Sequence, residues 1–462
     1  MHYNKFLILF FSLFFSLFNL NAQDKNDAAT IKNIFDEILT NDACYENLRY
    51  LTTQIGGRLS GSPQAAAAVD WTKEVMENYG FDTVFLQEVM VPHWVRGKKE
   101  IGRIVGSKKM GSLDVAVCAL GNSVGTGDKG VSANLVEVQD FEELKKLGKE
   151  NIQGKVVFFN RPMDPTLIQT FQAYGGAVNQ RGAGASEAAK YGAIGAIVRS
   201  MTTSSDDFPH TGSLNYTLNV PQIPAIAIST KDADLLSKLL KDDKELKFYF
   251  ETHCEMKEEK LSYNVVGQIT GIEFPEEYIA IGGHLDSWDL AQGAHDDGTG
   301  CMQSIEVLRV LKTLGIKPKR SIRAVMFMNE ENGLRGGLKY AELAKKNKEK
   351  HIAALESDSG GFTPKGFSIG GSDKVVEKVS AWSELFKPYK IHEFEAGGGG
   401  ADIGPLKAQD VPLFSFRPDS QRYFDYHHAS NDTFDKVNKR ELDLGAAAMT
   451  SLIYLIDKYG LQ

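Results

Sequence analysis

The second half of the chain alternates between short apolar runs and longer amphipathic segments. The apolar runs have strand length and predict strands over 278–283, 321–328, 351–355 and 411–416. The intervening and closing segments predict helices over 300–314, 336–346, 374–386 and 441–459. Strands that alternate with helices predict an α/β fold, in which helices flank a mixed, mostly parallel sheet.

The middle of the chain differs from the second half in its composition and in its predicted elements. Before it, helices are predicted over 28–39 and 64–79, and strands over 83–91, 101–105 and 113–119. A Gly- and Ala-rich segment, 175–195, then lies among short strands predicted over 135–138, 156–160, 196–199 and 221–228. The polar run Glu255–Lys260 is expected to be a linker. We therefore predict a domain over 120–260, inserted into a domain formed by 23–119 and 261–462.

The amino-terminal residues predict export. Lys5 precedes the apolar run 6–18, which is shorter than the roughly 20 residues that a membrane-spanning helix needs. Small and polar residues follow, so residues 1–22 are predicted to be a signal peptide cleaved after Ala22. The mature protein is then expected to be secreted or periplasmic and free of the membrane; an uncleaved anchor is the alternative.

The four cysteines leave two interpretations open. An exported protein can form disulfides, and four cysteines allow three pairings. Buried free thiols are the alternative. A zinc site made of cysteines is not expected, because no CxxC pair occurs among Cys44, Cys118, Cys254 and Cys301.

Composition and net charge argue against some classes of protein. Of the 462 residues, 42% are apolar and 24% charged, which is typical of a globular protein. The net charge of −8 argues against a nucleic-acid partner, since phosphate binding needs a basic surface.

Polar side chains gather where the predicted strands end. His284 and Asp286 follow one strand, Glu330 and Glu331 the next, and Asp358 a third. Asp296 precedes a helix, and His427-His428 follow the last strand. Because sites in open α/β sheets form at the carboxyl ends of strands, we expect these groups to converge. They are nitrogen and oxygen ligands of the kind that suits zinc.

The spacing within two clusters suggests roles. In a strand, the side chains of His284 and Asp286 point the same way, so the Asp286 carboxylate is expected to bond the imidazole nitrogen that does not bind metal. The adjacent side chains of Glu330 and Glu331 diverge, so one can bind metal while the other faces the space beside it.

The ordered set 284–289 (HLDSWD), 296–298 (DDG), 329–333 (NEENG), 356–358 (ESD) and His428 with 432–433 (DT) resembles the co-catalytic zinc peptidases of family M28. The segments 57–62 (GRLSGS), 92–94 (PHW) and 209–212 (PHTG) are similar to signatures of a carboxypeptidase subgroup of that family. The resemblance implies a zinc-peptidase (phosphorylase/hydrolase-like) α/β fold, and identifies 120–260 with a protease-associated-like domain.

The resemblance also implies a site with two Zn²⁺ ions. Asp296 would bridge the ions, with His284 and Asp358 on one, Glu331 and His428 on the other, and a shared water between them. Glu330 would be the general base, and Asp286 and Asp402 would support the ligands. Spacing alone does not decide between His427 and His428. His428 is preferred because it lies four residues before Asp432, as in relatives. The loop 397–402 (GGGGAD) lacks the tyrosine with which aminopeptidase members help to bind the oxyanion.

The implied function is that of a secreted exopeptidase, a carboxypeptidase or dipeptidase for dipeptides and short peptides, with a metal-bridging water as nucleophile and a homodimer as the expected assembly. The alternatives are an aminopeptidase of the same family and a metal-free, receptor-like binding ectodomain. The segment Gly366–Gly370 also matches the serine-hydrolase pattern G-x-S-x-G around Ser368. That pattern needs a strand before it and a helix directly after it, which the surrounding residues do not predict.

Overall fold

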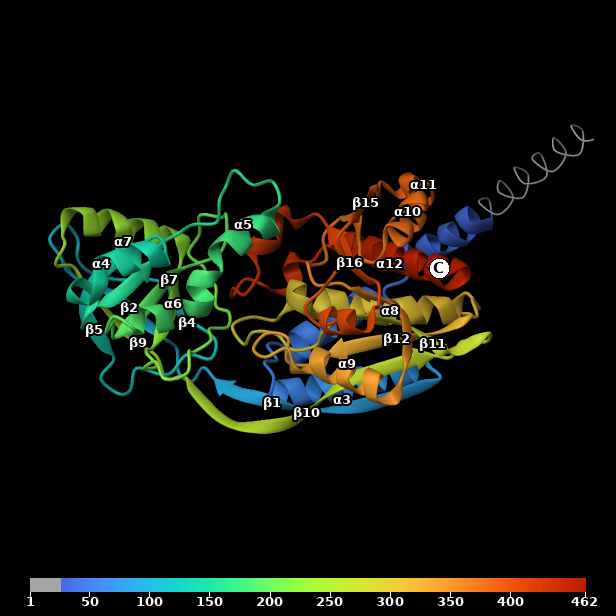
Figure 1. The fold of residues 1–462 in the computed structure, drawn as a ribbon, viewed down its shortest axis with the longest axis horizontal. Helices are drawn as coiled ribbons and strands as arrows, with labels where there is room; N and C mark the ends of the chain where they lie inside the picture. The colour runs from blue at the N-terminus through green and yellow to red at the C-terminus, as the bar shows by residue number, and fades with distance from the viewer. Residues whose placement is uncertain (1–25) are drawn as a thin grey trace, which may run out of the picture.

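The chain folds around two eight-stranded sheets, which lie at opposite ends of the long axis of the molecule (Figure 1). The computed structural model describes residues 26–462. The predicted signal peptide therefore lies outside the described residues. Within residues 26–462, no helix combines the length and the apolar character needed to cross a membrane.

The first sheet has the mixed, mostly parallel character that the sequence predicts. Its strand order is β1-β10-β12-β11-β13-β16-β14-β15. Strands β12, β11, β13 and β16 are mutually parallel, whereas β10 and β14 run antiparallel to their neighbours β12 and β16. The bounds are β1 Thr83–Val95, β10 Glu255–Ile269, β11 Phe274–His284, β12 Arg320–Phe327, β13 Lys350–Glu356, β14 Pro364–Ile369, β15 Glu393–Ala396 and β16 Leu413–Pro418.

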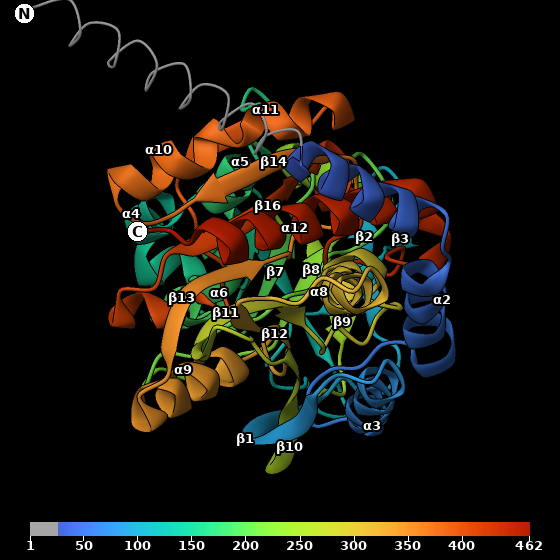
Figure 2. The ribbon, with the colours of Figure 1, turned by 90° about the vertical axis from the view of Figure 1, so that its right-hand side faces the viewer.

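Helices cover both faces of this sheet, which confirms the predicted α/β layers (Figure 2). One face carries residues 26–39, α2 (Ala43–Tyr50), α3 (Pro63–Asn78), α8 (Thr299–Thr313), α10 (Asp373–Ala381), α11 (Ser383–Phe386) and α12 (Lys439–Tyr459). The other carries α9 (Arg335–Asn347), whose Tyr340 packs with Ala280 and Val325. The central strands are thus buried on both sides, which explains why they read as continuous apolar runs.

The second sheet begins earlier in the chain than the predicted insertion at residue 120. Its order is β3-β2-β9-β5-β6-β7-β8-β4. Strand β2 pairs with β9, and β4 pairs with β8, so 101–119 belong to this sheet rather than to the first one. Composition shows that the character of the chain changes near this point, but it does not show with which strand each strand pairs. The strands are β2 Ile101–Ser107, β3 Gly111–Asp114, β4 Val117–Ala119, β5 Val131–Val138, β6 Val156–Phe159, β7 Gly195–Arg199, β8 Ala225–Ile228 and β9 Lys247–Glu251; the helices are α4 Phe141–Ile152, α5 Thr170–Ala177, α6 Asn179–Ala189 and α7 Thr230–Asp242.

A long antiparallel ribbon joins the two parts. Strands β1 and β10 pair from Thr83↔Gln268 to Val95↔Glu255, and they lead into and out of the second sheet (Figure 1). The linker predicted over Glu255–Lys260 was wrong, because these residues form the exposed first part of β10. A ribbon that is open to solvent does not need the apolar alternation by which a strand is recognised in sequence.

All four cysteines are buried, free thiols. Of the two interpretations left open by the sequence, the structure therefore supports free thiols. Cys301 lies on α8 directly behind the polar strand ends, where its thiol contacts the carbonyl oxygen of His284 at 3.1 Å.

Candidate metal centre

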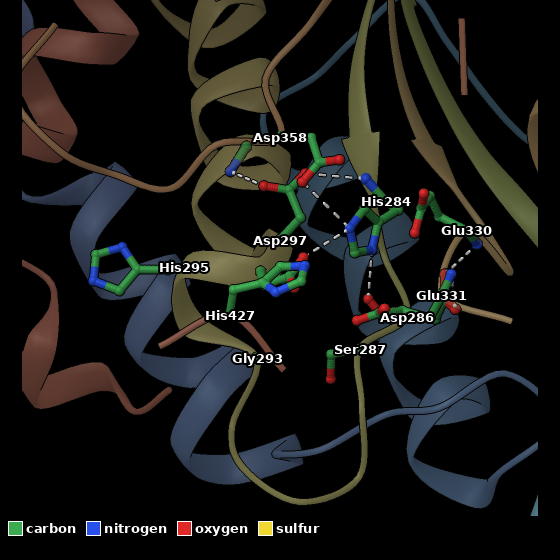
Figure 3. A network of polar contacts seen from close by, with 12 residues as sticks. His284, Asp286, Ser287, Gly293, His295, Asp297, Glu330, Glu331, Asp358 and His427 are labelled. Carbon is green, nitrogen blue, oxygen red and sulfur yellow. Dashed lines mark hydrogen bonds and ion pairs between the residues drawn. The ribbon is translucent and has the colours of Figure 1, made fainter. Parts of the chain in front are cut away.

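The polar groups predicted at strand ends do converge at one edge of the first sheet (Figure 3). His284 is the last residue of β11, and Asp296 lies in the turn between β11 and α8. Glu331 follows β12, and Asp358 follows β13. His428 lies in the turns after β16. The parallel strands β11, β12 and β13 end on the same side, and this places their following residues together.

Five of these side chains form two adjoining groups that share Asp296. In the first, Nε2 of His284 lies 3.1 Å from Oδ1 of Asp296 and 3.6 Å from Oδ1 of Asp358. In the second, Nε2 of His428 lies 3.3 Å from Oδ2 of Asp296 and 3.0 Å from Oε2 of Glu331. Each carboxylate oxygen of Asp296 therefore faces a different group.

Burial and charge at these groups fit a bound cation. Asp296 Oδ2 and Glu331 Oε2 are buried and lack a hydrogen-bond donor in the described part of the chain. Burial raises the pKa of both carboxyls, that of Glu331 well above its ordinary value, and burial lowers the pKa of His428. Leaving carboxylates buried without a partner is costly. A divalent cation supplies the missing partner, and this nitrogen and oxygen donor set is one that zinc accepts.

The geometry distinguishes the two adjacent histidines. His427 and His428 stack, with ring centroids 3.6 Å apart, and both lie close to Asp296. Nε2 of His427 is 3.9 Å from Asp296 Oδ2, whereas Nε2 of His428 reaches both Asp296 and Glu331 within 3.3 Å. His428 therefore has the better position for a ligand, as its spacing from Asp432 suggested.

Asp286 lies at the site but acts on a different neighbour from the one expected. Its backbone carbonyl, not its carboxylate, lies 2.9 Å from Nδ1 of His284. Its carboxylate accepts hydrogen bonds from the backbone amides of Asn329 (2.7 Å), Glu330 (3.0 Å) and Glu331 (3.4 Å). The expected contact assumed that strand alternation continues, but β11 ends at His284 and the chain turns there.

Glu330 stands beside the two groups without joining either. It is half-buried, and within residues 26–462 no group donates a hydrogen bond to its carboxylate. Burial raises its pKa to about 8; the carboxylates of Asp358 and Asp296 add to the rise, and His284 opposes it. An unpartnered carboxylate at this place can take up and release a proton.

Asp402 is buried near Glu330 but contacts none of the grouped side chains through a hydrogen bond. Its two carboxylate oxygens have no hydrogen-bond partner within the described residues. Burial raises its pKa well above the ordinary value, and the nearby carboxylates of Glu356 and Glu330 raise it further. The structure therefore gives Asp402 no hydrogen bond to a proposed ligand, and its supporting role stays a prediction.

The second sheet's part of the chain contributes contacts that sequence reasoning did not assign. Nη1 of Arg181, on α6, lies 3.4 Å from Nδ1 of His428. The carbonyl of Thr211 lies 3.3 Å from the same nitrogen, and the Thr211 amide donates to the His428 carbonyl at 2.9 Å. Gly212 leaves room for the Arg181 guanidinium, because a Cβ there would lie 2.5 Å from Cζ. The segment 209–212, similar to a signature of the carboxypeptidase subgroup, was the available signal in the sequence.

Two further residues, from segments that pack around the first sheet, hold the site. The Asp432 carboxylate accepts from the amides of His295 at 2.8 Å and Asp296 at 3.2 Å, and so fixes the turn that carries Asp296. The buried guanidinium of Arg58 donates to the carbonyls of Leu285, Gln292 and Gly293. The segment 57–62 thereby clamps the loop that follows β11.

Tyr423 is another functional candidate that the sequence did not single out. Its ring is buried, and its hydroxyl lies 3.4 Å from Oδ1 of Asp358. Burial, together with the carboxylates of Asp296 and Asp358, raises the pKa of Tyr423 well above its ordinary value, so its hydroxyl is a donor.

Ser368 does not have the environment of a serine nucleophile. It lies within strand β14, and its hydroxyl accepts a hydrogen bond from the Gly398 amide at 2.6 Å. A nucleophile elbow places the serine on a sharp turn between a strand and a helix. The serine-hydrolase alternative is therefore not supported.

Comparison with known proteins gives concordant matches. Residues 264–453 match the model of peptidase family M28. Carboxypeptidase Q from Bos taurus is 34% identical over 412 residues, which cover 89% of this chain and 84% of the relative. A crystal structure of a peptidase M28 precursor from Shewanella amazonensis superposes with a TM-score of 0.89 at 33% identity, covering 95% of this chain and 99% of that one. A zinc aminopeptidase from Bacillus subtilis superposes with a TM-score of 0.63 at 19% identity over 89% of this chain and 94% of that one, a likeness of fold alone.

Proposed function

The chain belongs to peptidase family M28 and is a metallopeptidase, and from this premise we propose that it is a secreted di-zinc exopeptidase that releases a terminal residue from dipeptides or short peptides. The observation that carries the proposal is the position of Asp296, whose two carboxylate oxygens face two separate groups of potential ligands. A single-metal site would not need a shared carboxylate of this kind.

The two ions would be held by neighbouring sets of side chains. His284, Asp296 and Asp358 would hold one, and Asp296, Glu331 and His428 the other. Three protein ligands on each ion leave an open position, which is typical of catalytic rather than structural zinc. Bound zinc supplies Lewis acidity, which makes water a better nucleophile and polarises a carbonyl. His427 would then pack against His428 without binding metal.

Glu330 would perform the proton transfers. Its free carboxylate lies beside the ligand groups, so it can accept the proton of the attacking water. The same group can later give that proton to the leaving amine. The Asp286 carboxylate, by bonding the amides of Asn329 and Glu330, would keep the base in place.

We propose a carboxypeptidase or dipeptidase rather than an aminopeptidase. Support comes from the relatives, since carboxypeptidase Q from Bos taurus is 34% identical, whereas aminopeptidase YwaD from Bacillus subtilis is 22% identical. A panel of unblocked, N-blocked and C-amidated dipeptides tests the choice. Turnover that requires a free carboxylate supports it, and turnover of N-free, C-amidated peptides alone contradicts it.

Three finer features complete the proposal. Residues 1–22 would be a signal peptide, which amino-terminal sequencing of exported protein tests. The part around the second sheet, predicted over 120–260, would be a protease-associated-like domain inserted into the peptidase domain predicted over 23–119 and 261–462. Its start would lie at Ile101, where β2 begins, so that 101–119 would belong to the insertion and not to the peptidase domain. The assembly would be a homodimer, which analytical ultracentrifugation tests.

One experiment tests the proposed function as a whole. Zinc content and dipeptide turnover are measured in parallel for wild type and Glu330→Gln. We expect both proteins to bind zinc and only the wild type to hydrolyse dipeptides. A wild type that binds no zinc would instead favour the receptor-like alternative.

A further inference from the structure

The segment 210–213 (HTGS) belongs to the part of the chain around the second sheet and lies against the second ligand group. Its own part of the chain holds it firmly. A hydroxyl, a carbonyl and an amide of the segment form hydrogen bonds with Ala119, Gly121 and Ser200, at 2.8, 3.0 and 2.8 Å. The segment therefore has a fixed position relative to the second sheet.

On one side the segment holds the backbone of His428. The Thr211 amide donates to the His428 carbonyl at 2.9 Å, and Nδ1 of His210 donates to the His427 carbonyl at 2.7 Å. These two carbonyls flank the backbone dihedrals of His428, whose φ is +61°. Residues other than glycine rarely adopt this left-handed conformation, and it persists only where surrounding contacts fix it. The hydrogen bonds from His210 and Thr211 are contacts of that kind.

On the other side the segment holds the loop that carries Glu331. The Ser213 hydroxyl donates to the Glu331 carbonyl at 2.6 Å. The side-chain amide of the next residue, Asn332, donates to Oδ1 of Asn122 at 3.3 Å, which adds a second contact from the part around the second sheet. One short segment thus bonds the main chain of both Glu331 and His428, whose side chains meet at 3.0 Å.

The first ligand group is held in a different way. Within the described chain, no hydrogen bond from residues 101–251 reaches His284 or Asp358. Nδ1 of His284 faces the Asp286 carbonyl at 2.9 Å, and Oδ1 of Asp358 faces the Tyr423 hydroxyl at 3.4 Å. These partners all come from segments around the first sheet. The two groups therefore differ in what orients them, although they share Asp296.

We propose that residues 210–213 position the ligands of the second ion, so that the part of the chain around the second sheet determines how tightly this ion binds. The inference rests on the proposed di-zinc function and adds positioning residues to it. His210, Thr211 and Ser213 bind no metal themselves and act through Glu331 and His428. Loss of a hydrogen-bonding partner that orients a metal ligand typically lowers metal affinity about 10–100-fold.

The test is a titration of Zn²⁺ into metal-free protein, with a competing chelator of known affinity. Two backgrounds separate the ions, because His284→Ala should keep only the ion of the second group and Glu331→Ala only that of the first. We expect His210→Phe to raise the Kd for zinc about 10–100-fold in the His284→Ala background. It should leave the Kd unchanged in the Glu331→Ala background.

Further variants separate positioning from general damage to the fold. His210→Asn keeps a donor near the place of Nδ1 and should restore most of the affinity that His210→Phe loses. Ser213→Ala, a smaller change on the Glu331 side, should also weaken only the second ion, and it serves if His210→Phe does not fold. The matched control is His351→Phe. His351 is likewise buried and hydrogen-bonded, to Tyr340 at 2.8 Å, but it lies at the start of β13 and should affect neither ion.

Equal weakening of both ions, or an unchanged second ion in His210→Phe and Ser213→Ala, overturns the inference and leaves the proposed function standing. The same weakening of the second ion in His351→Phe also overturns it. A wild type that binds fewer than two Zn²⁺ ions contradicts the proposed function, and the inference with it. That outcome is distinguishable from the others, because it is seen without any change in residues 210–213.

Discussion

The backbone carbonyl of Asp286 lies 2.9 Å from Nδ1 of His284, and this leaves the Asp286 carboxylate to hold the backbone of the next strand's end. One residue thus fixes the imidazole of a proposed ligand through its main chain. Through its side chain it fixes the loop that carries Glu330 and Glu331. A nitrogen bonded to a carbonyl carries the hydrogen, so Nε2 is the nitrogen left to face the carboxylates.

Asp286→Ala is therefore expected to damage the Glu330 loop and to spare the bond to His284. Removing this buried acceptor leaves at least two backbone amides without a hydrogen-bond partner. Each unsatisfied amide costs about 1–3 kcal/mol of folding stability. We expect a lower melting temperature and a lower kcat, measured by calorimetry and dipeptide turnover. Asp286→Asn keeps one acceptor oxygen and should lose less. Equal losses in both variants would contradict this role.

Glu330→Gln is expected to abolish proton transfer without removing metal. General acid–base catalysis contributes about 10²–10⁴-fold, so kcat should fall by that amount. Zinc content should equal that of wild type, because the Glu330 carboxylate belongs to neither ligand group. A variant that loses zinc in step with activity would show instead that Glu330 is a ligand.

We expect Gly212→Ala to lower the activity by displacing the Arg181 side chain, which lies beside His428. A Cβ at this position would lie 2.5 Å from the Arg181 Cζ, and Gly212 has a φ of +130°, which other residues rarely adopt. The guanidinium must shift from its present place beside His428, and a displacement of ~1 Å at a site can cost on the order of 10²-fold in rate. Gly176→Ala is the matched control, since open space surrounds Gly176 on α5. If both variants retain wild-type kcat/KM, Arg181 does not position His428.

His351 gives a pH dependence of stability far from the metal centre. Burial, helped by Arg323, lowers its pKa to about 4, while its Nε2 pairs with the Tyr340 hydroxyl at 2.8 Å. Below the ordinary histidine pKa of about 6.5, His351 binds a proton in the unfolded chain but not in the folded chain. Stability should therefore fall as the pH drops from about 6.5 toward 4.

Urea denaturation of wild type and His351→Gln at pH 7 and pH 5 checks this. Glutamine does not titrate, so the stability advantage of wild type over the variant should shrink by about 2 kcal/mol at the lower pH, from 1.36 kcal/mol per pKa unit. An advantage that stays the same at both pH values would mean that His351 does not titrate as described.

The sequence anticipated the parts of this molecule that depend on local pattern. The buried strands β11, β12 and β13 can be recognised in the sequence by their apolar runs. Because parallel strands end at the same edge of a sheet, the polar residues that follow them must meet there. That reasoning predicted the clusters, and the resemblance to family M28 then singled out His284, Asp296, Glu331, Asp358 and His428; the structure brings these five side chains together.

The parts that escaped prediction depend on contacts between distant segments. Arg181 lies 247 residues from His428 in the chain, and no periodicity links them. The Asp286 carboxylate was predicted to bond the His284 imidazole because β11 was assumed to continue beyond His284. Residues 255–260 read as a linker because an exposed ribbon strand has no buried face to leave a pattern.

The zinc content of wild type, His284→Ala and Asp296→Ala tests most directly whether one shared carboxylate and its neighbours hold two ions. Mass-spectrometric metal analysis of protein purified with added zinc should give two equivalents in wild type. It should give about one in His284→Ala, because His284 contacts only the first group, and close to none in Asp296→Ala, because both groups lose their common oxygen donor. A single equivalent in wild type, or two retained after Asp296→Ala, would contradict the account.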